Sequence, residues 1–206
     1  AIFTKLMAIS RKSPKALRQL LFRRIRKQMG GNLRMVISGG APLSNTVGEW
    51  WNLLGIDVIQ GYGATEASPI IACHPEKSPR FDCPGPPPPG VEIRIDTTGE
   101  VLVRGNNITP GYWEDEKKTK ESFEDDWYKT GDQGFIDENG FLILNGRKKD
   151  MIVLPNGQNV YPEDLEQILQ SHVSIIDAVV VGIDNDDGPE VHAALILDNH
   201  EMAPEV

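Results

Sequence analysis

Six consecutive residues combine several kinds of ligand chemistry. Residues 61–66 read Gly-Tyr-Gly-Ala-Thr-Glu and follow a short, mainly apolar segment at 56–59. The glycines let the backbone approach a ligand closely, the tyrosine offers a flat face for a base, and the threonine offers a hydroxyl for an anionic oxygen. The glutamate is a carboxylate of the kind that holds Mg²⁺ beside phosphates. These residues are Gly61, Gly63, Tyr62, Thr65 and Glu66. They predict a nucleotide site; the alternative is a strand-end turn followed by a helix cap.

Two later motifs strengthen the nucleotide interpretation. Residues 128–132 read Tyr-Lys-Thr-Gly-Asp and residues 146–150 read Gly-Arg-Lys-Lys-Asp. Asp132, presented by a Thr-Gly turn, can accept hydrogen bonds from both hydroxyls of a ribose, because an ionised carboxylate has two acceptor oxygens. Arg147 brings a forked, permanent cation suited to ribose oxygens or phosphate. Each motif alone is a common turn or hairpin exit, but their order after residues 61–66 is specific.

In this order the motifs resemble the adenylate-forming superfamily, which includes acyl-CoA synthetases, firefly luciferase and the adenylation domains of peptide synthetases. Three further segments look most like medium- to long-chain fatty acyl-CoA synthetases; they lie at residues 38–44, 99–105 and 110–112. The resemblance runs from about Leu33 to the C-terminus. It implies adenylation of a fatty or other carboxylic acid by ATP with Mg²⁺, leaving AMP on the acyl group, and then thioester formation with coenzyme A.

The resemblance also implies roles for single residues. It places Gly40, Ala41 and Pro42 at the border of the adenine. It places Gln60 near the amino edge of the base and stacks Tyr62, which lies between Gly61 and Gly63 in the sequence, on the adenine ring. For the rest of the nucleotide it assigns Thr65 to the α-phosphate, Glu66 to Mg²⁺, Asp132 to the ribose and Arg147 to a nucleotide contact. Lys149 corresponds to a hinge for a small C-terminal domain, and Gly157 to the lining of the pantetheine tunnel of CoA.

Two features of the family are absent from the sequence. No Ser/Thr/Gly-rich loop ending in Pro-Lys-Gly precedes Gly39, and no lysine follows Lys149. Both features would stabilise transferring phosphates electrostatically. We therefore expect a C-terminal portion, cut short, of a fatty acyl-CoA synthetase that is inactive alone. The alternatives are an adenylate-forming ligase for aryl or amino acids, or a non-catalytic nucleotide-binding module.

The elements that must position these motifs follow from sequence patterns. Residues 14–60 predict helix, strand 33–38, a helix capped by Ser44 and stopped by Gly55, and strand 56–60. This alternation is typical of a parallel sheet in a doubly wound α/β unit, whose ligands bind beyond the carboxyl ends of strands. Both Gly39-Gly40 and residues 61–66 fall at such ends, so we expect them in one cleft.

Short strands and then a mixed pattern follow. Residues 79–148 predict a small β-barrel subdomain, with a turn at 97–99 and a hairpin at Asn139-Gly140. Residues 149–206 predict strand 151–154, a turn at 156–157, a helix from Pro162, and strands 175–183 and 191–197, as in an incomplete α+β domain. With 1–78 as part of a large N-terminal α/β AMP-binding domain, the expected class is α/β and α+β.

Composition is that of a soluble globular protein, with 39% hydrophobic and 25% charged residues. No apolar run approaches the roughly 18 residues of a membrane span and no signal peptide is visible, so we expect a cytoplasmic protein. Cys73 and Cys83 are the only cysteines. Free thiols in a reducing cytosol are favoured over a disulfide, which the sequence leaves open.

Charge is distributed unevenly along the chain. Residues 1–48 contain ten Lys or Arg and no Asp or Glu. Much of this charge lies on an expected helix at 14–29, with an apolar face that includes Leu17, Leu20, Leu21, Ile25 and Met29, opposite a basic face that includes Arg18, Arg23, Arg24, Arg26 and Lys27. A solvated surface helix is the favoured interpretation, and weak contact with anionic lipid at a membrane surface is the alternative. Nucleic acid is not expected as a partner, because no base-reading motif accompanies the charge.

Overall fold

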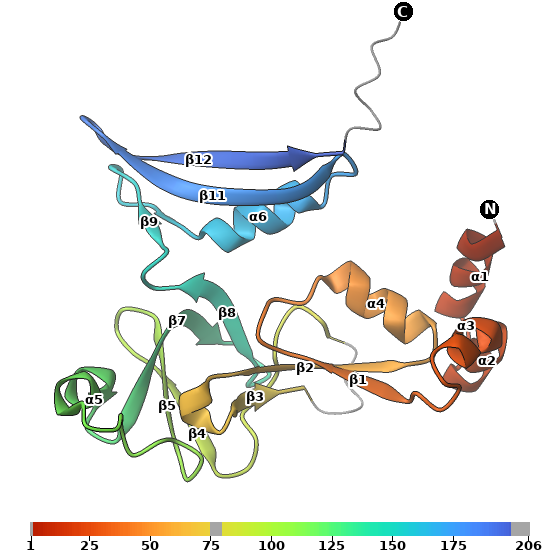
Figure 1. Ribbon diagram of the computed structural model, residues 1–206, viewed down its shortest axis with the longest axis horizontal. Helices are drawn as coiled ribbons and strands as arrows, with labels where there is room; N and C mark the ends of the chain where they lie inside the picture. The colour runs from red at the N-terminus through yellow and green to blue at the C-terminus, as the bar shows by residue number, and fades with distance from the viewer. Residues whose placement is uncertain (1, 75–79, 199–206) are drawn as a thin grey trace, which may run out of the picture. The chain divides into compact units, whose positions relative to one another are not determined.

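The computed structural model describes residues 2–74 and 80–198 (Figure 1). The chain divides into two compact units. The first comprises residues 1–94, 103–128 and 136–143, and the second comprises 95–102, 129–135 and 144–206. The expected boundary at 78/79 and the end of the chain from 199 lie outside the described residues. The division into 1–78, 79–148 and 149–206 stays a prediction.

Four helices open the first unit: α1 (Ile2–Arg11), α2 (Lys15–Leu21), α3 (Arg23–Gln28) and α4 (Asn45–Leu53). The single helix expected at 14–29 is wrong, because the chain breaks it at Phe22 into α2 and α3. Phe22 is buried in one cluster with Met7 and Leu53. Burying this large ring against α1 and α4 compensates for the interrupted helix.

The expected division of residues 14–29 into an apolar and a solvated basic face is also partly wrong. Arg26 is only 9% exposed. Its guanidinium donates to the carbonyls of Gly55 (3.1 Å) and Leu33 (2.9 Å). Leu20, expected on the buried face, is 65% exposed. Arg26 therefore satisfies carbonyl groups at two chain turns, a role that helical periodicity does not reveal.

A three-stranded sheet lies beside α4 (Figure 1), in the order β1 (Met35–Ser38), β2 (Asp57–Gly63) and β3 (Ile70–Cys73). Strands β1 and β2 are parallel, as expected, while β3 is antiparallel to β2. Gly55 has φ +75° and ends α4, where the next amide donates to the carbonyl of Trp51 (3.2 Å). Ser44 occupies the N-cap position, but its side chain makes no capping hydrogen bond.

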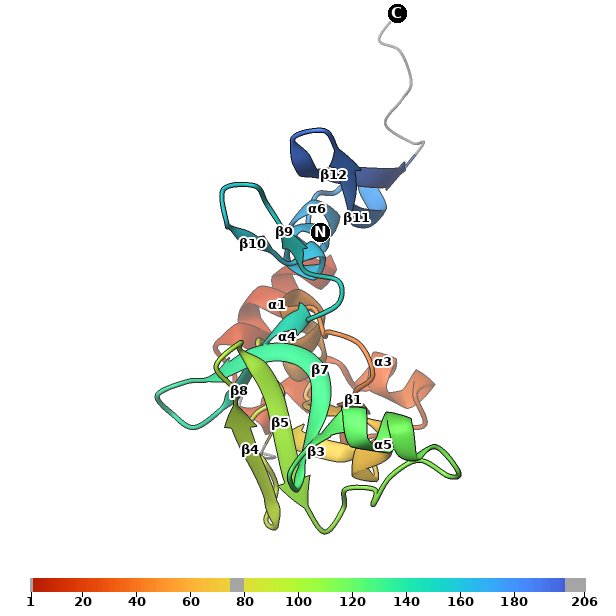
Figure 2. The same ribbon diagram turned by 90° about the vertical axis from the view of Figure 1, so that its left-hand side faces the viewer.

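A curled, half-barrel sheet follows, with strand order β4 (Val91–Ile95), β5 (Glu100–Gly105), β7 (Trp127–Ile136) and β6 (Phe123–Glu124); β8 (Leu142–Arg147) also pairs with β7 (Figure 2). Strands β4, β5, β7 and β8 contribute residues to both units. The expected hairpin at Asn139-Gly140 is confirmed, since the amide of Asp137 donates to the carbonyl of Phe141 (2.9 Å). Helix α5 (Glu116–Ser122), which the sequence patterns did not indicate, precedes β6.

The second unit continues through β9 (Ile152–Val153), β10 (Asn159–Val160), α6 (Pro162–Gln170), β11 (Ile175–Asn185) and β12 (Gly188–Leu197). The helix beginning at Pro162 and the two later strands are confirmed. Strands β11 and β12 form an antiparallel pair that α6 packs against (Figures 1 and 2). Ala178 and Val180 are the buried side chains of β11. The expected mixed α/β fold is confirmed.

Candidate functional site

The segments around Gly39 and Gly61 lie close together where the parallel pairing of β1 and β2 ends. Ser38, the last residue of β1, is in register with Gln60, and β2 continues beyond this point through Gly63. A Cβ added to Gly39 would lie 3.0 Å from the carbonyl oxygen of Gly61. A side chain at position 39 would thus crowd the backbone at residue 61. The residues expected to border adenine follow directly and are exposed: Gly40, Ala41 and Pro42.

The sequence predicted that residues 61–66 form a loop after a strand that ends at residue 60. This is wrong. Strand β2 continues through Gly63 because Gly61 and Tyr62 pair with Cys73 and Ala72 of β3. A Cβ added to Gly63 would overlap the carbonyl of Pro69, which accepts a hydrogen bond from the amide of Ala64 (3.0 Å). Gly63 therefore serves the turn of its own chain. A Cβ at Gly61 would make only an ordinary 3.8 Å contact.

Glu66 lies on the short 3₁₀ helix η1 (Thr65–Ala67) and is held by a distant part of the sequence. The hydroxyl of Tyr112 donates to its Oε1 (2.8 Å), and the amide of Thr109 donates to its backbone carbonyl (2.7 Å). The hydrogen bond from Tyr112 is the largest cause that lowers the pKa of Glu66. Burial raises the pKa of the neighbouring Tyr128. Glu66 is therefore an ionised acceptor for the hydroxyl of Tyr112.

This carboxylate suits a magnesium site of the kind completed by a bound nucleotide. Within the described part of the chain, no three His, Cys, Asp or Glu side chains gather closely enough to form a metal site. Mg²⁺ is commonly bound through one or two carboxylates together with phosphate oxygens and water. An ionised Glu66 fits that pattern, and Thr65, exposed at the start of η1, is its neighbour in the chain.

Gln60 carries an unsatisfied acceptor beside the same turns. Its Oε1 is buried and has no hydrogen-bond partner among the described residues. Its backbone carbonyl accepts from the amide of His74 (3.0 Å), which fixes the chain at this position. A buried acceptor without a donor costs about 1–3 kcal/mol, so a ligand amino group would be favoured there. Tyr62, the next aromatic side chain, is half-buried on β2.

In the second unit, the residues expected at the ribose pair with each other. The Nε of Arg147 lies 3.0 Å from Oδ1 of Asp132, whose side chain is 15% exposed. The amide of Asp132 donates to Oγ1 of Thr130 (3.1 Å), and that hydroxyl donates to the carbonyl of Val101 (2.8 Å). Asp132 lies within β7 and not in the expected turn, and Arg147 is the last residue of β8. The two strands thus present one carboxylate beside one forked cation, an arrangement suited to a polar, hydroxyl-bearing ligand.

Glu100 connects the two motifs, and sequence reasoning missed it. Its buried carboxylate accepts from the amide of Gly131 (3.1 Å) and forms an ion pair with Nζ of Lys148 (2.7 Å). The amide of Lys148 donates in turn to the carbonyl of Gly131 (2.8 Å). The hydrogen bond to Glu100 raises the pKa of Lys148. A glutamate at the start of a β-strand has no local signal for such a role.

Lys149 and Gly157 lie in turns of the second unit. Lys149 is exposed in the turn between β8 and β9, where the amide of Asp150 donates to the carbonyl of Arg147 (3.1 Å). Gly157 has φ +84° in the turn between β9 and β10, with no atom within 4 Å of an added Cβ. These positions are compatible with a hinge and an accessible loop, and both roles stay predictions.

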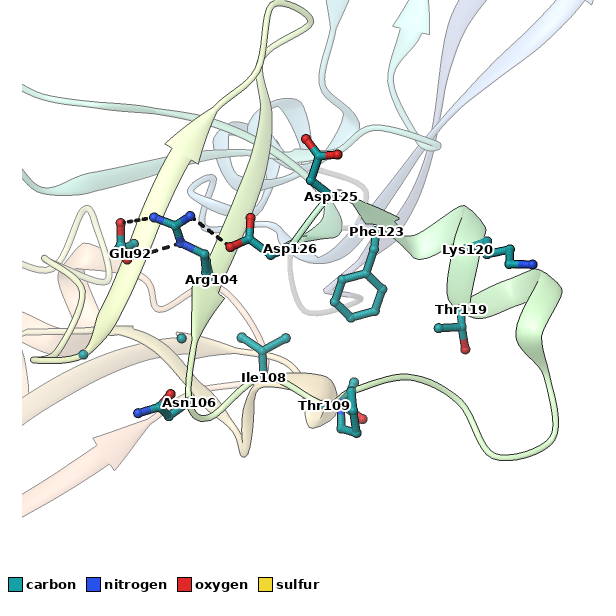
Figure 3. A pocket seen from close by; sticks show the side chains of 13 residues that line it. Glu92, Arg104, Asn106, Ile108, Thr109, Thr119, Lys120, Phe123, Asp125 and Asp126 are labelled. Atoms are coloured by element: carbon teal, nitrogen blue, oxygen red, sulfur yellow. Dashed lines mark hydrogen bonds and ion pairs between the residues drawn. The ribbon is translucent and has the colours of Figure 1, made fainter.

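A cavity of about 870 Å³ lies elsewhere in the first unit, between β4, β5 and α5 (Figure 3). The guanidinium of Arg104 bridges Glu92 (2.7 Å) and Asp126 (3.0 Å) at its edge. Ile108 and Phe123 contribute apolar surface. None of the residues predicted for the nucleotide lines this cavity.

Two general expectations can be compared with the described residues. Cys73 and Cys83 are both free thiols, as favoured. None of the helices in residues 2–74 and 80–198 combines the length and apolar character needed to cross a membrane.

Comparison with known proteins assigns the family. The model of the AMP-binding enzyme family matches residues 1–113, more than half of the chain. The chain therefore belongs to the AMP-binding enzymes, and the expected adenylate-forming superfamily is confirmed.

Three similar proteins place the chain within that family. It is 42% identical over 180 residues to a protein of Mycobacterium bovis named long-chain-fatty-acid–CoA ligase FadD15, covering 87% of this chain and 30% of the relative. It resembles ATP-bound MatB of Rhodopseudomonas palustris with a TM-score of 0.78 and 29% identity, covering 97% of this chain and 44% of that one. A Bacillus subtilis O-succinylbenzoate-CoA synthetase with ATP and magnesium gives a TM-score of 0.74 and 29% identity, covering 87% of this chain and 40% of that one. The chain thus spans about a third of the length of its curated relative.

Proposed function

We propose that this chain supplies the adenosine-binding part of an ATP-dependent acid–thiol ligase. Such an enzyme joins a carboxylic acid to the α-phosphate of ATP, releases pyrophosphate, and transfers the acyl group to the thiol of coenzyme A. The observation that carries the proposal is the close approach of Gly39 to Gly61 where the parallel pairing of β1 and β2 ends, with the ionised Glu66 shortly after β2. Parallel sheets bind nucleotides at such ends.

Residues of the first unit would bind the base and the phosphates. The orphaned Oε1 of Gln60 would accept a hydrogen bond from the adenine amino group, and Tyr62 would stack on the ring. Gly40, Ala41 and Pro42 would border the base. Glu66 would bind Mg²⁺, which neutralises phosphate charge, and the hydroxyl of Thr65 would donate to an α-phosphate oxygen.

Residues of the second unit would bind the sugar and serve the second half-reaction. Asp132 would accept hydrogen bonds from the ribose hydroxyls while Arg147, which it orients, donates to the nucleotide. Lys149 would act as the hinge between the two half-reactions, and Gly157 would line the pantetheine path of CoA. The isolated chain would be inactive, because it contains neither the phosphate loop nor the C-terminal lysine of the family.

We further propose that the acid is a long-chain fatty acid, supported by the 42% identity to the M. bovis ligase. The test is thioester formation by the longer protein that contains this chain, given ATP, Mg²⁺, CoA and either palmitate, butyrate or 2-succinylbenzoate. Palmitoyl-CoA should form fastest. A preference for 2-succinylbenzoate would contradict the proposed fatty-acid substrate but not the proposed ligase activity. Formation of no thioester from any of these acids would contradict the ligase activity.

A further inference from the structure

A segment of the first unit wraps around the helix that carries Glu66. We call residues 107–112 the strap. The amide of Asn107 donates from Nδ2 to the carbonyls of Ala67 (2.7 Å) and Ile70 (2.9 Å). The amide of Thr109 donates to the carbonyl of Glu66 (2.7 Å). The strap thus fixes the backbone of η1 at Glu66 and Ala67, and that of β3 at Ile70, although it is distant from them in the sequence.

Tyr112, at the end of the strap, fixes the side chain as well. Its hydroxyl donates to Oε1 of Glu66 (2.8 Å). A glutamate with a free side chain has three rotatable bonds, and ordering them on ligand binding costs conformational entropy. A hydrogen bond already made in the unliganded protein removes part of that cost.

Tyr112 is itself held in place by α5. Its amide donates to Oγ1 of Thr119 (2.9 Å), and the ammonium of Lys118 lies 4.2 Å from the centre of its ring. The carboxylate of Asp115 caps the helix by accepting from the amide of Lys118 (2.9 Å). Gly111 has no Cβ, which would come 2.6 Å from a methyl carbon of Thr119. The ring of Tyr112 is therefore positioned before any ligand binds.

We propose that Tyr112 is a positioning residue for the magnesium-binding carboxylate, and that α5 together with the strap forms its support. The inference rests on the proposed function of Glu66 and adds a residue that touches neither nucleotide nor metal. Its hydroxyl sets the orientation in which Glu66 meets the cation. The same bond favours the ionised carboxylate, consistent with the lowered pKa of Glu66.

The test is the magnesium dependence of acid-dependent ATP–pyrophosphate exchange by the longer protein. Tyr112→Phe removes only the hydroxyl and should raise the half-saturating free Mg²⁺ concentration about fivefold to tenfold, less than the loss of a whole hydrogen bond to a charged group, because the carboxylate itself remains. The exchange rate at saturating Mg²⁺ and the metal-free affinity for AMP should change less than about twofold, because positioning is lost rather than chemistry. Tyr161→Phe, on the other unit, is the matched control and should leave the magnesium dependence unchanged.

Thr119→Val is the second variant, because it loosens Tyr112 while keeping its hydroxyl. It should raise half-saturating Mg²⁺ in the same direction but by less. Unchanged magnesium dependence in folded Tyr112→Phe, or in folded Thr119→Val where Tyr112→Phe does not fold, would overturn the inference. So would equal losses of rate and magnesium affinity that track a lower melting temperature.

A second readout separates this inference from the proposed function. The mobility of the Glu66 side chain can be measured by NMR relaxation in the metal-free 206-residue chain labelled with ¹³C-glutamate, with Glu66→Gln used for assignment. Tyr112→Phe should increase this mobility, because the hydrogen bond that orients the carboxylate is lost. Unchanged mobility would overturn the positioning role even where the longer protein forms no adenylate. Increased mobility in Tyr112→Phe, together with no exchange by the wild-type longer protein, would contradict only the ligase proposal.

Discussion

At the scale of single residues, Asp132 is held in one orientation by its neighbours. Its backbone is fixed through Thr130, and its carboxylate is oriented by Arg147 at 3.0 Å. Arg147 is about half-exposed, so their ion pair contributes little to folding stability. This arrangement favours a binding role over a purely structural one.

We predict that Asp132→Ala in the longer protein weakens AMP binding without lowering stability substantially. Each lost charge-assisted hydrogen bond to ribose is worth about 1.5–3 kcal/mol, so affinity should fall at least about tenfold. Calorimetry of AMP binding measures this, with exposed Asp186→Ala as the matched control. Equal AMP affinity in Asp132→Ala and the wild type would remove Asp132 from the site.

The ionisation of Glu66 should make the stability of the protein depend on pH. Its pKa in the folded protein is lowered, mainly by Tyr112, so the ionised form contributes stability above its unfolded pKa of about 4.5. That contribution is lost as the pH falls through the lower, folded value. The melting temperature of the wild type should therefore exceed that of Glu66→Gln most at pH 7, and the gap should narrow towards pH 3. A gap that stays constant over this range would contradict the ionised, hydrogen-bonded state.

At the scale of elements, strand β2 provides a matched pair of glycines. Gly63 faces the carbonyl of Pro69 and has no space for a methyl group, whereas a Cβ at Gly61 meets ordinary contact distances. Gly63→Ala should lower the free energy of unfolding by about 3 kcal/mol through overpacking, and Gly61→Ala by less than about 1 kcal/mol. Urea unfolding measures both. If both variants lost the same free energy of unfolding, the turn between β2 and β3 would not be the reason for a glycine at position 63.

Local signals in the sequence predicted several elements correctly. Asn139-Gly140 marks a hairpin and Pro162 marks the first turn of α6, because both depend on the backbone preferences of a few adjacent residues. The extension of β2 through Gly63 was not predictable in this way, since it depends on pairing with β3. The break at Phe22 likewise results from burial against α1 and α4.

The same distinction between local sequence signals and tertiary packing applies to the candidate site. The approach of Gly39 to the segment at Gly61 could be predicted, because it follows from parallel strands, while the roles that the motifs predict for single residues stay predictions. The bond from Tyr112 to Glu66 joins residues 46 apart, and the pairing of Asp132 with Arg147 joins strands β7 and β8. Such contacts arise from tertiary packing and leave no periodic signal in the sequence.

At the scale of the whole molecule, a substitution at Lys149 tests the proposed change of domain arrangement between the two half-reactions. Proline fixes φ near −65° and lacks an amide proton, so Lys149→Pro should hold one arrangement of the longer protein. We expect a loss of at least about tenfold in either pyrophosphate exchange or CoA transfer from preformed acyl adenylate, with the other step nearly unchanged. Lys149→Ala, which keeps the backbone free, should affect neither strongly. Equal losses in both steps that follow a lower melting temperature would rule out the hinge.

Carboxylate-dependent ATP–pyrophosphate exchange, measured on the longer protein and on the 206-residue chain, tests the central claim most directly. The longer protein should exchange pyrophosphate only when a carboxylic acid is present, and palmitate should support the fastest exchange. The 206-residue chain should show no comparable exchange, because each missing phosphate contact costs about 3–4 kcal/mol of transition-state stabilisation. Exchange by the short chain at the rate of the longer protein, or no exchange by the longer protein with any acid, would contradict the account.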